Sequence, residues 1–404
     1  MDARPQLEVA DVVREHGDDY RLAHHPSAAQ EKVLSNIAVC RTALLGGNVD
    51  ECLDGCGHIR VSYNSCRDRH CPKCQGPQRA EWLAGRLIRV LPTEHFHVVF
   101  TIPDELNPLV LRNKKTLYKI LFDSASQTLL DLARDGKRLG AFIGITAVLH
   151  TWGQNLLFHP HLHCIVTGGG LSPYGAKWIP GRERYLLPVA VIGKLFRGKF
   201  LDALHRAYKS GKLDLAGSTA GLADPMIWST LKDQLYRKNW VVYAKPPFGG
   251  VEHVFKYLGR YTHRVAISNH RLIEMNNGHV TFSLRDYKNS GQKTTMTLSA
   301  VEFLRRFLLH VLPGGFTRIR HYGLYAGRNV KDKLATARRL LDPDSETAPP
   351  KQKDSRPWWE RFLENTGVDV MRCPRCGGRL VRTRRFNPSS LDFPSTGTDA
   401  GDTS

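Results

Sequence analysis

The segment HPHLHCIV, residues 159–166, places three histidines at alternate positions and ends in an apolar run. The apolar end favours a β-strand, in which side chains two residues apart point the same way. His159, His161 and His163 would then share one face of the strand. Neutral imidazole is a common ligand of divalent metal ions. The segment therefore predicts a metal-binding strand, and the alternative is a half-buried strand with a polar outer face.

The composition of the chain favours a nucleic acid as its partner. Its 404 residues are enough for two or three domains. They include 58 Lys and Arg against 38 Asp and Glu, which gives a formal charge of +20. These charges are spread over all regions rather than along one amphipathic helix, which argues against an anionic membrane surface. Because the sequence shows neither a signal peptide nor an apolar run approaching ~18 residues, we expect a cytoplasmic protein.

Strand and helix patterns alternate through the middle of the chain. Residues 95–103 (HFHVVFTIP) and 141–153 (AFIGITAVLHTWG) have the β-branched and aromatic content of strands. The second of these should pair antiparallel with the histidine strand. Helical patterns cover residues 109–136, 191–210 and 252–264, and a hairpin over 279–299 leads into a helix over 300–312. The alternation predicts an α+β fold, with helices packed on a central, largely antiparallel sheet.

The remaining patterns divide the chain into three parts. A helix should start at the candidate N-cap Ser27 and end near Gly47, and a basic amphipathic helix should cover residues 77–92. A polar, proline-containing stretch over 342–357 is typical of a linker, and residues 387–404 should be disordered. We therefore expect a helical and zinc-binding domain over 1–90, a central domain over 91–330, and a linker, CxxC segment and tail over 331–404.

Cysteines cluster near the N-terminus in a pattern that indicates metal binding. Six of the nine fall within residues 40–74, which in a reducing compartment favours zinc over disulfides. Cys71 and Cys74 have the spacing of a zinc knuckle, and Cys52 and Cys56 form a looser pair. Four thiolates from these pairs would make one closed, structural site. Two further residues are spare ligands for this site or for a second ion, namely Cys66 and His70. Buried free thiols are the alternative.

A second cysteine pair lies near the C-terminus. Cys373 and Cys376, in the sequence CPRCGG, are similar to half of a zinc ribbon. No second pair follows them in the chain, so Cys40 or a second protomer could complete a site. Zinc binding here is left open.

Residues 252–268 (EHVFKYLGRYTHRVAIS) carry two tyrosines four positions apart. On a helix this spacing places Tyr257 and Tyr261 on one face, about one turn apart. Such a pair is more often part of a core or an interface. Beside a metal-binding strand, however, it suits nucleophilic attack on a DNA phosphodiester, with the metal polarising a phosphate oxygen. Positive charge that could bind DNA surrounds the pair at Lys256, Arg260 and Arg264.

Four motifs together carry a resemblance to a known family. His161-Leu162-His163 resembles the two-histidine signature of HUH endonucleases, and residues 97–103 (HVVFTIP) resemble the strand motif that precedes it in rolling-circle initiators. Residues 257–264 (YLGRYTHR) resemble the two-tyrosine motif. With the cysteine-rich residues 62–75, the whole order resembles the two-tyrosine transposases of the insertion sequence 91 family, from about Cys52 to Arg328.

The resemblance implies a function and its cofactors. It implies an HUH-type fold, and cleavage and rejoining of single-stranded DNA at element ends and target site through 5′-phosphotyrosine intermediates. It also implies catalytic Mg²⁺ or Mn²⁺, structural Zn²⁺, and a bacterial, nucleoid-associated location. Self-association is left open. The three-residue gap between Cys52 and Cys56 departs from the expected two.

The third metal ligand and the exact activity leave alternatives. His159 is slightly favoured as the third ligand, although Pro160 could bend the strand, and His150 or Gln154 could reach across from the neighbouring segment. A rolling-circle replication initiator or relaxase would share the same chemistry. In a non-enzymatic zinc-dependent DNA-binding regulator, the histidines and tyrosines would be structural.

Overall fold

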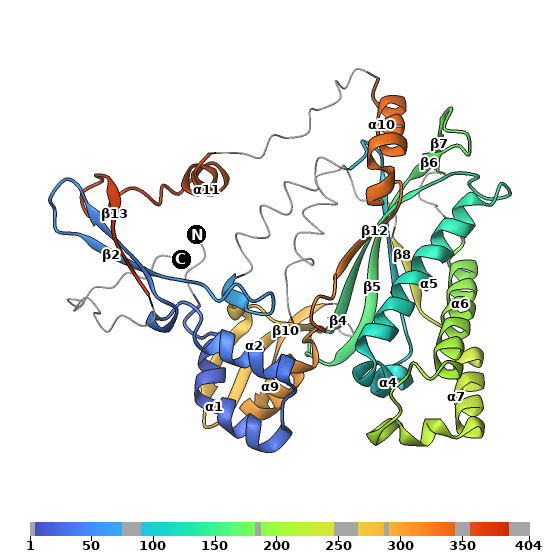
Figure 1. Cartoon of the computed structure of the whole chain (residues 1–404), viewed down its shortest axis with the longest axis horizontal. Helices are drawn as coiled ribbons and strands as arrows, with labels where there is room; N and C mark the ends of the chain where they lie inside the picture. Colours follow the sequence, from blue (N-terminus) through green and yellow to red (C-terminus); the bar gives the residue numbers. More distant parts are fainter. Residues whose placement is uncertain are drawn as a thin grey trace.

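The computed structural model describes residues 5–74, 90–181, 187–245, 266–286, 291–343 and 356–387. Its strands pair antiparallel and its helices pack on them, which confirms the predicted α+β class with antiparallel sheets. Figure 1 shows the largest sheet with its helices on one side of the molecule, and strands β2 and β13 on the other. None of the described helices is long and apolar enough to cross a membrane.

A five-stranded sheet forms the centre of the larger half. Its strand order is β12-β4-β5-β3-β8, and each neighbouring pair is antiparallel. β4 and β5 are neighbours, as the sequence predicted. The strands are β3 (His95–Thr101), β4 (Gly144–Trp152), β5 (Phe158–Thr167), β8 (Val242–Lys245) and β12 (Ile319–Gly323).

Alternation of side chains gives this sheet two different faces. Phe100, Leu149 and Leu162 are fully buried on one face, in the core that the helices complete. Successive side chains in a strand alternate between the two faces. His150 follows Leu149 and His163 follows Leu162, so both histidines point to the opposite face. The helices that cover the apolar face are α4 (Asn107–Arg112), α5 (Lys114–Arg134), α6 (Val189–Lys209) and α7 (Pro225–Arg237).

Two helices differ from their predicted extents. The helix expected over 109–136 is interrupted at Asn113, whose side chain donates hydrogen bonds to the Leu109 and Asp214 oxygens at 3.2 and 2.9 Å. Ser27 caps α2 (Ala28–Ala38) as predicted, but this helix ends well before Gly47. The chain then turns so that the Cys40 sulfur lies against other cysteines, and it continues into a strand.

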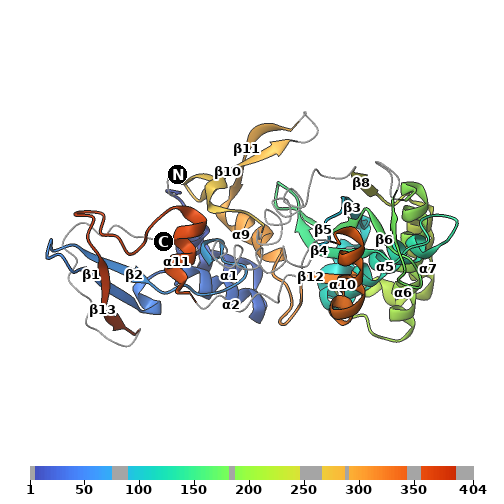
Figure 2. The same ribbon diagram turned by 90° about the horizontal axis from the view of Figure 1, so that it is seen from above.

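A second core joins segments that are distant in sequence. Val12 and Ile37, from the two N-terminal helices, share this core with Phe282, Phe303 and Phe307. The packing therefore crosses the domain boundary expected near residue 90. Its elements are α1 (Val9–His24), α2, β9 (Leu272–Asn276), β10 (His279–Asp286), β11 (Gln292–Ser299) and α9 (Ala300–Leu309). Figure 2 shows the β10–β11 hairpin extending away from this core.

The C-terminal segment also returns to the N-terminal part. β13 (Leu380–Phe386) pairs with β1 (Gly47–Cys52), which pairs in turn with β2 (Ile59–Tyr63). Figures 1 and 2 show these strands at one end of the molecule. The other short elements are β6 (Gly169–Leu171), β7 (Trp178–Pro180), α10 (Ala335–Leu341), α11 (Trp358–Thr366), the π-turn η7 (Val330–Leu334) and the 3₁₀ turns η1 (Ala43–Leu45), η2 (Pro72–Cys74), η3 (Asp104–Leu106), η4 (Gly217–Ala223), η5 (Asn269–Arg271) and η6 (Gly327–Asn329).

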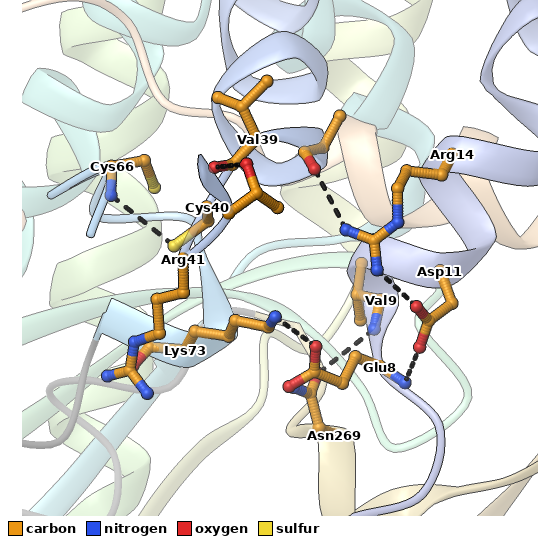
Figure 3. A network of polar contacts seen from close by, with 12 residues as sticks. Glu8, Val9, Asp11, Arg14, Val39, Cys40, Arg41, Cys66, Lys73 and Asn269 are labelled. Atoms are coloured by element: carbon orange, nitrogen blue, oxygen red, sulfur yellow. Dashed lines mark hydrogen bonds and ion pairs between the residues drawn. The ribbon is translucent and has the colours of Figure 1, made fainter. Parts of the chain in front are cut away.

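A polar network fixes the start of α1 to the cysteine-rich segment (Figure 3). Glu8 caps the helix and forms an ion pair with Lys73. The Val9 amide donates to the Asn269 side chain at 3.2 Å. Arg41 donates to the backbone oxygen of Lys73 at 3.1 Å. These contacts hold η2 and η5 beside the first helix.

Candidate metal centres and family

The histidine cluster forms across two strands rather than along one. The ligand atoms of His150, His161 and His163 all lie within 4.8 Å of one another. His150 on β4 stands opposite His161 on β5, and the ring centroids of His150 and His163 are 4.3 Å apart. Any two ligand atoms that lie ~2.1 Å from a tetrahedral ion are roughly 3.4 Å apart. Small rotations of the three side chains would therefore bring their nitrogens to the distances that a metal ion requires.

His159 does not take part in this cluster, although the sequence slightly favoured it. Residues i and i+4 of a strand are roughly 13 Å apart, so His159 and His163 cannot both contact one ion. A cross-strand neighbour is much closer, at roughly 5 Å. The structure therefore brings in His150, the alternative that the neighbouring segment offered. Gln154, the other alternative, lies between the two strands, where its backbone oxygen accepts a hydrogen bond from Arg271.

Hydrogen bonds orient two of the three imidazoles. His161 donates from Nδ1 to the His159 backbone oxygen at 2.6 Å, so Nε2 is the nitrogen that could coordinate a metal ion. The Nδ1 atom of His163 shares a hydrogen bond of 2.8 Å with Nε2 of His97 on β3, and the planes of the two rings are only 3° apart. A partner of this kind sets the tautomer and orientation of a metal ligand. His97 was missed by sequence reasoning, although a histidine within the largely apolar strand HFHVVFTIP was a usable signal.

Burial keeps the imidazoles of His97, His161 and His163 uncharged. It lowers the pKa of His161 to about 4 and that of His97 to about 4, and it places the pKa of His163 well below its ordinary value of 6.5. Neutral imidazole is the form that binds a metal ion. Burial also lowers the pKa of the nearby Arg318 to about 9, and its guanidinium lies 4.9 Å from the Trp152 ring. His161 and His163 are therefore neutral near neutral pH, the form in which an imidazole can coordinate a metal ion.

The first cysteine cluster lies inside the second core. The Sγ atoms of Cys40, Cys66, Cys71 and Cys74 lie within 4.8 Å of one another. Cys74 is 3.4 Å from Cys40 and 3.5 Å from Cys66, sulfur to sulfur. Four sulfurs at ~2.3 Å from a tetrahedral zinc ion lie roughly 3.8 Å apart, so these residues fit zinc. The Cys66 amide also donates to the Cys40 sulfur, as Figure 3 shows.

The second cysteine cluster joins the two ends of the chain. It contains Cys52, Cys56, Cys373 and Cys376, again with all sulfurs within 4.8 Å. Cys52 is 3.4 Å from Cys376, and Cys56 is 3.6 Å from Cys373. The Arg375 side chain donates to the Cys56 oxygen at 2.8 Å, which fixes the two loops to each other. This set also fits a structural zinc ion.

The grouping of cysteines therefore differs from the expected one. Cys52 and Cys56 were expected to share a site with Cys71 and Cys74, but the β1–β2 hairpin separates the pairs. Cys52 and Cys56 lie at its tip, and the other two follow its base. A strand of five or six residues spans roughly 17–20 Å, which is too far for a common ion.

The two spare ligands have different fates. Cys66 joins the first cluster, whereas His70 does not. Both nitrogens of the His70 ring are occupied, since Nδ1 bonds to Asp68 at 3.0 Å and Nε2 accepts from the Leu312 amide at 3.2 Å. Burial lowers the pKa of His70 below its ordinary value, although the contact with Asp68 acts in the opposite direction. His70 thus connects the cysteine-rich segment to the chain after α9.

The expected tyrosine motif lies outside the described residues. Tyr257, Tyr261 and the basic residues Lys256, Arg260 and Arg264 all fall within 246–265. Two other tyrosines, Tyr322 and Tyr325, follow in the chain. The Tyr325 hydroxyl is buried against His95 Nε2 at 2.8 Å, and burial raises the pKa of Tyr322 to about 12. Neither is placed as an accessible nucleophile.

Comparison with known proteins identifies the family. Residues 144–333 match a family model described as "Putative transposase", and residues 12–102 match one described as "Transposase zinc-binding domain" of the insertion sequence 91 type. The chain is 48% identical to "Putative transposase y4qJ" of Sinorhizobium fredii over 95% of its own length and 97% of that protein. It belongs to the insertion sequence 91 family of transposases.

A second relative of the transposase is more distant. The "Transposase for insertion sequence element IS801" of Pseudomonas savastanoi pv. phaseolicola is 29% identical over 87% of this chain and 83% of that protein. No solved structure gives a significant match. As a transposase, the protein is an enzyme that acts on DNA, and it carries a zinc-binding domain. Cys373 and Cys376 lie beyond both matched regions.

We predict that the transposase holds two zinc ions per chain, one in each cysteine cluster. Replacing Cys373 by serine should remove one of them, because a closed site needs its four thiolates, and leave the other in the second core. Elemental analysis of folded, reduced protein measures this. Cys164→Ala is the matched control, because Cys164 is buried in a strand away from both clusters. A Cys373→Ser protein that retains two zinc ions would contradict the assignment.

The buried histidines predict that acid destabilises the protein. Their pKa values lie below 6.5 in the folded chain, at about 4 for His97 and His161, so the unfolded state binds more protons as the pH falls. Stability from this source is present in full above pH ~6.5 and declines towards pH ~4. The melting temperature should fall across that window. In His97→Gln the decline should be shallower, and an equal slope in the two proteins would count against His97 as a contributor.

Proposed function

We propose that the transposase cuts and rejoins single-stranded DNA at the ends of its element through phosphotyrosine intermediates. The observation that carries this proposal is the cluster of His150, His161 and His163 on the central antiparallel sheet. A metal site built on two paired strands is held rigidly, as precise placement of a phosphate group requires. The proposal includes an HUH-type fold for the central sheet and its helices.

The three imidazoles would hold Mg²⁺ or Mn²⁺. When bound, the ion polarises a nonbridging phosphate oxygen and neutralises charge that develops as the phosphodiester is attacked. An all-nitrogen ligand set suits Mn²⁺ better than Mg²⁺, which prefers oxygen ligands. His97 and the His159 backbone oxygen would orient the ligands. We therefore expect cleavage to need less Mn²⁺ than Mg²⁺.

Tyr257 and Tyr261 are the proposed nucleophiles, on the two-tyrosine sequence motif. A tyrosine oxygen forms a bond to phosphorus while the bond to the 3′ oxygen breaks. The departing 3′ oxygen takes up a proton, and the tyrosine loses its own to solvent. The energy of the phosphodiester is kept in the protein–DNA bond and can be used to rejoin strands. Two tyrosines allow a second strand to be cut while the first is held.

Positive charge would hold the substrate. The formal charge of +20 favours binding to the phosphate backbone, and Lys256, Arg260 and Arg264 flank the proposed nucleophiles in sequence. The relatives are transposases, which favours this activity over a replication initiator, a relaxase or a non-enzymatic regulator. Formation of a covalent protein–DNA product on labelled single-stranded element ends would distinguish the enzyme from a regulator.

Replacing the clustered histidines tests the metal site. His150→Ala and His163→Ala should each lower the cleavage rate by more than about 100-fold, since even a residue that only orients a ligand is worth 10–100-fold. DNA binding should persist, because it depends on many phosphate contacts. Cleavage of labelled DNA with Mn²⁺ measures the rate, and anisotropy measures binding.

His159→Ala is the matched control for this test. His159 is an exposed histidine on the same strand, and it lies outside the cluster. Its variant should cleave at close to the native rate, because a backbone oxygen, which the substitution retains, makes the contact to His161. If His159→Ala lost activity and His150→Ala did not, the proposed ligand set would be wrong.

The two tyrosines should be separable by substitution. Tyr257→Phe and Tyr261→Phe should each leave some nicking of a simple oligonucleotide but block complete transposition, which needs two cleavages. The double variant should form no covalent adduct on denaturing gels. Tyr236→Phe, a surface substitution on α7, is the control. An adduct from the double variant would show that the nucleophile is another residue.

A further inference from the structure

A cavity lies at the end of the central sheet that is far from the histidine cluster. Its volume is about 690 Å³, within the range of small-ligand sites. Its walls come from the C-terminal end of α5, from β6 and the turn after it, and from η7 and α10. Figure 1 shows these elements gathered at the upper end of the sheet. The residues that matter below are Arg134, Phe142, Ser172, Tyr174, Asp332 and Lys333.

The lining combines aromatic rings with cations. The Arg134 guanidinium lies 5.1 Å from the centroid of the Phe142 ring, and the Lys333 ammonium lies 4.7 Å from it. Tyr174 is 98% exposed at the turn between β6 and β7. Asp332 contributes one negative charge, so the net charge of the described lining is positive.

The turn that carries Tyr174 is itself ordered by hydrogen bonds. The Ser172 hydroxyl accepts from the backbone amides of Ala176 and Lys177 at 3.1 and 3.2 Å. The Ser172 amide donates to the Lys177 oxygen at 2.9 Å. The backbone that carries Tyr174 is therefore ordered, and its exposed ring is one of the residues that line the cavity.

This combination matches an unpaired nucleotide. Single-stranded DNA is bound by aromatic rings that stack on bases and by cations that contact phosphates. Arg134 and Lys333 both lie over the Phe142 ring. Their N–H groups can also donate hydrogen bonds to a phosphate. A carboxylate such as Asp332 can accept from the amino group of a base. An acidic peptide would use the cations but would leave the exposed tyrosine unused.

We propose that this cavity binds one unpaired nucleotide of the single-stranded DNA substrate, with its base on Tyr174 and its phosphate on Arg134 and Lys333. The inference rests on the proposed function, because it assumes a single-stranded substrate. β5 and β6 connect the two sites, and the chain from His163 to Leu171 spans at most roughly 26 Å. A strand bound at both ends of the sheet would be positioned before it is cut.

Binding to a fluorescently labelled thymidine oligonucleotide tests the inference. The full chain is used, with its zinc retained and no divalent metal added, so that cleavage does not contribute. Tyr174→Ala should weaken binding about tenfold, since one stacked base is worth roughly 5- to 150-fold in affinity. Lys333→Ala should weaken binding and lower the salt slope by about 0.7, the value for one phosphate contact on a single strand.

Matched controls come from the helical layer, outside the residues that line the cavity. Tyr236→Ala on α7 and Lys212→Ala after α6 remove one exposed tyrosine and one exposed lysine. Both should bind as the native chain does. If Tyr174→Ala and Lys333→Ala also bind as the native chain does, the inference is overturned.

Photocrosslinking gives a second, independent readout. An oligonucleotide with 5-iodouracil should crosslink to a peptide that contains Tyr174, and crosslinks confined to other peptides would overturn the inference. The outcome is separable from that of the proposed function. If His163→Ala loses cleavage and Tyr174→Ala does not change binding, the inference about the cavity is wrong and the proposed function is supported. If His163→Ala cleaves normally and Tyr174→Ala weakens binding, the proposed metal site is wrong and the inference about the cavity is supported.

Discussion

The antiparallel pairing of β4 with β5 is the constraint on which the candidate catalytic centre depends. It places His150 opposite His161 and next to His163, so that three imidazoles from two strands meet on one face. The ladder hydrogen bonds fix this register, and a slip by one residue would turn the histidines into the apolar core. The same alternation sends Leu149 and Leu162 to the helices. The core and the site therefore depend on the same strand register.

The two faces of the central sheet have different roles. Its helix-covered face supplies the apolar burial that stabilises the larger half, so the opposite face can hold polar groups at some cost. That cost is moderated by pairing, as in the hydrogen bond between His97 and His163 and the one from His161 to a backbone oxygen. Arg318 lies near this face, where its partly buried guanidinium donates to the Leu149 oxygen. The face is polar and ordered, and Arg318 adds one positive charge near it, which suits contact with a phosphate.

The cysteine clusters do a different job, which is to join distant parts of the chain. The first fixes the end of α2 and η2 into a core that also includes α9, and the second attaches the CPRCGG turn to the tip of the β1–β2 hairpin. The β1–β13 ladder adds backbone pairing to the second attachment. Because the joined residues are more than 300 positions apart, closing this loop costs considerable entropy, which a bound metal can offset.

The sequence by itself determined the local features and the chemistry. The period-two pattern around His161 and His163 gave the strand and its two faces and indicated a candidate metal site, and Ser27 marked the start of α2. These signals are local, since each depends on residues a few positions apart. What only the tertiary structure decided was which residues from separate segments come together. His150 replaced His159 because cross-strand distance is shorter than distance along a strand, and Cys52 joined Cys376 because the hairpin and the C-terminal strand pair. Such contacts depend on register and packing over the whole chain, and residue spacing does not encode them.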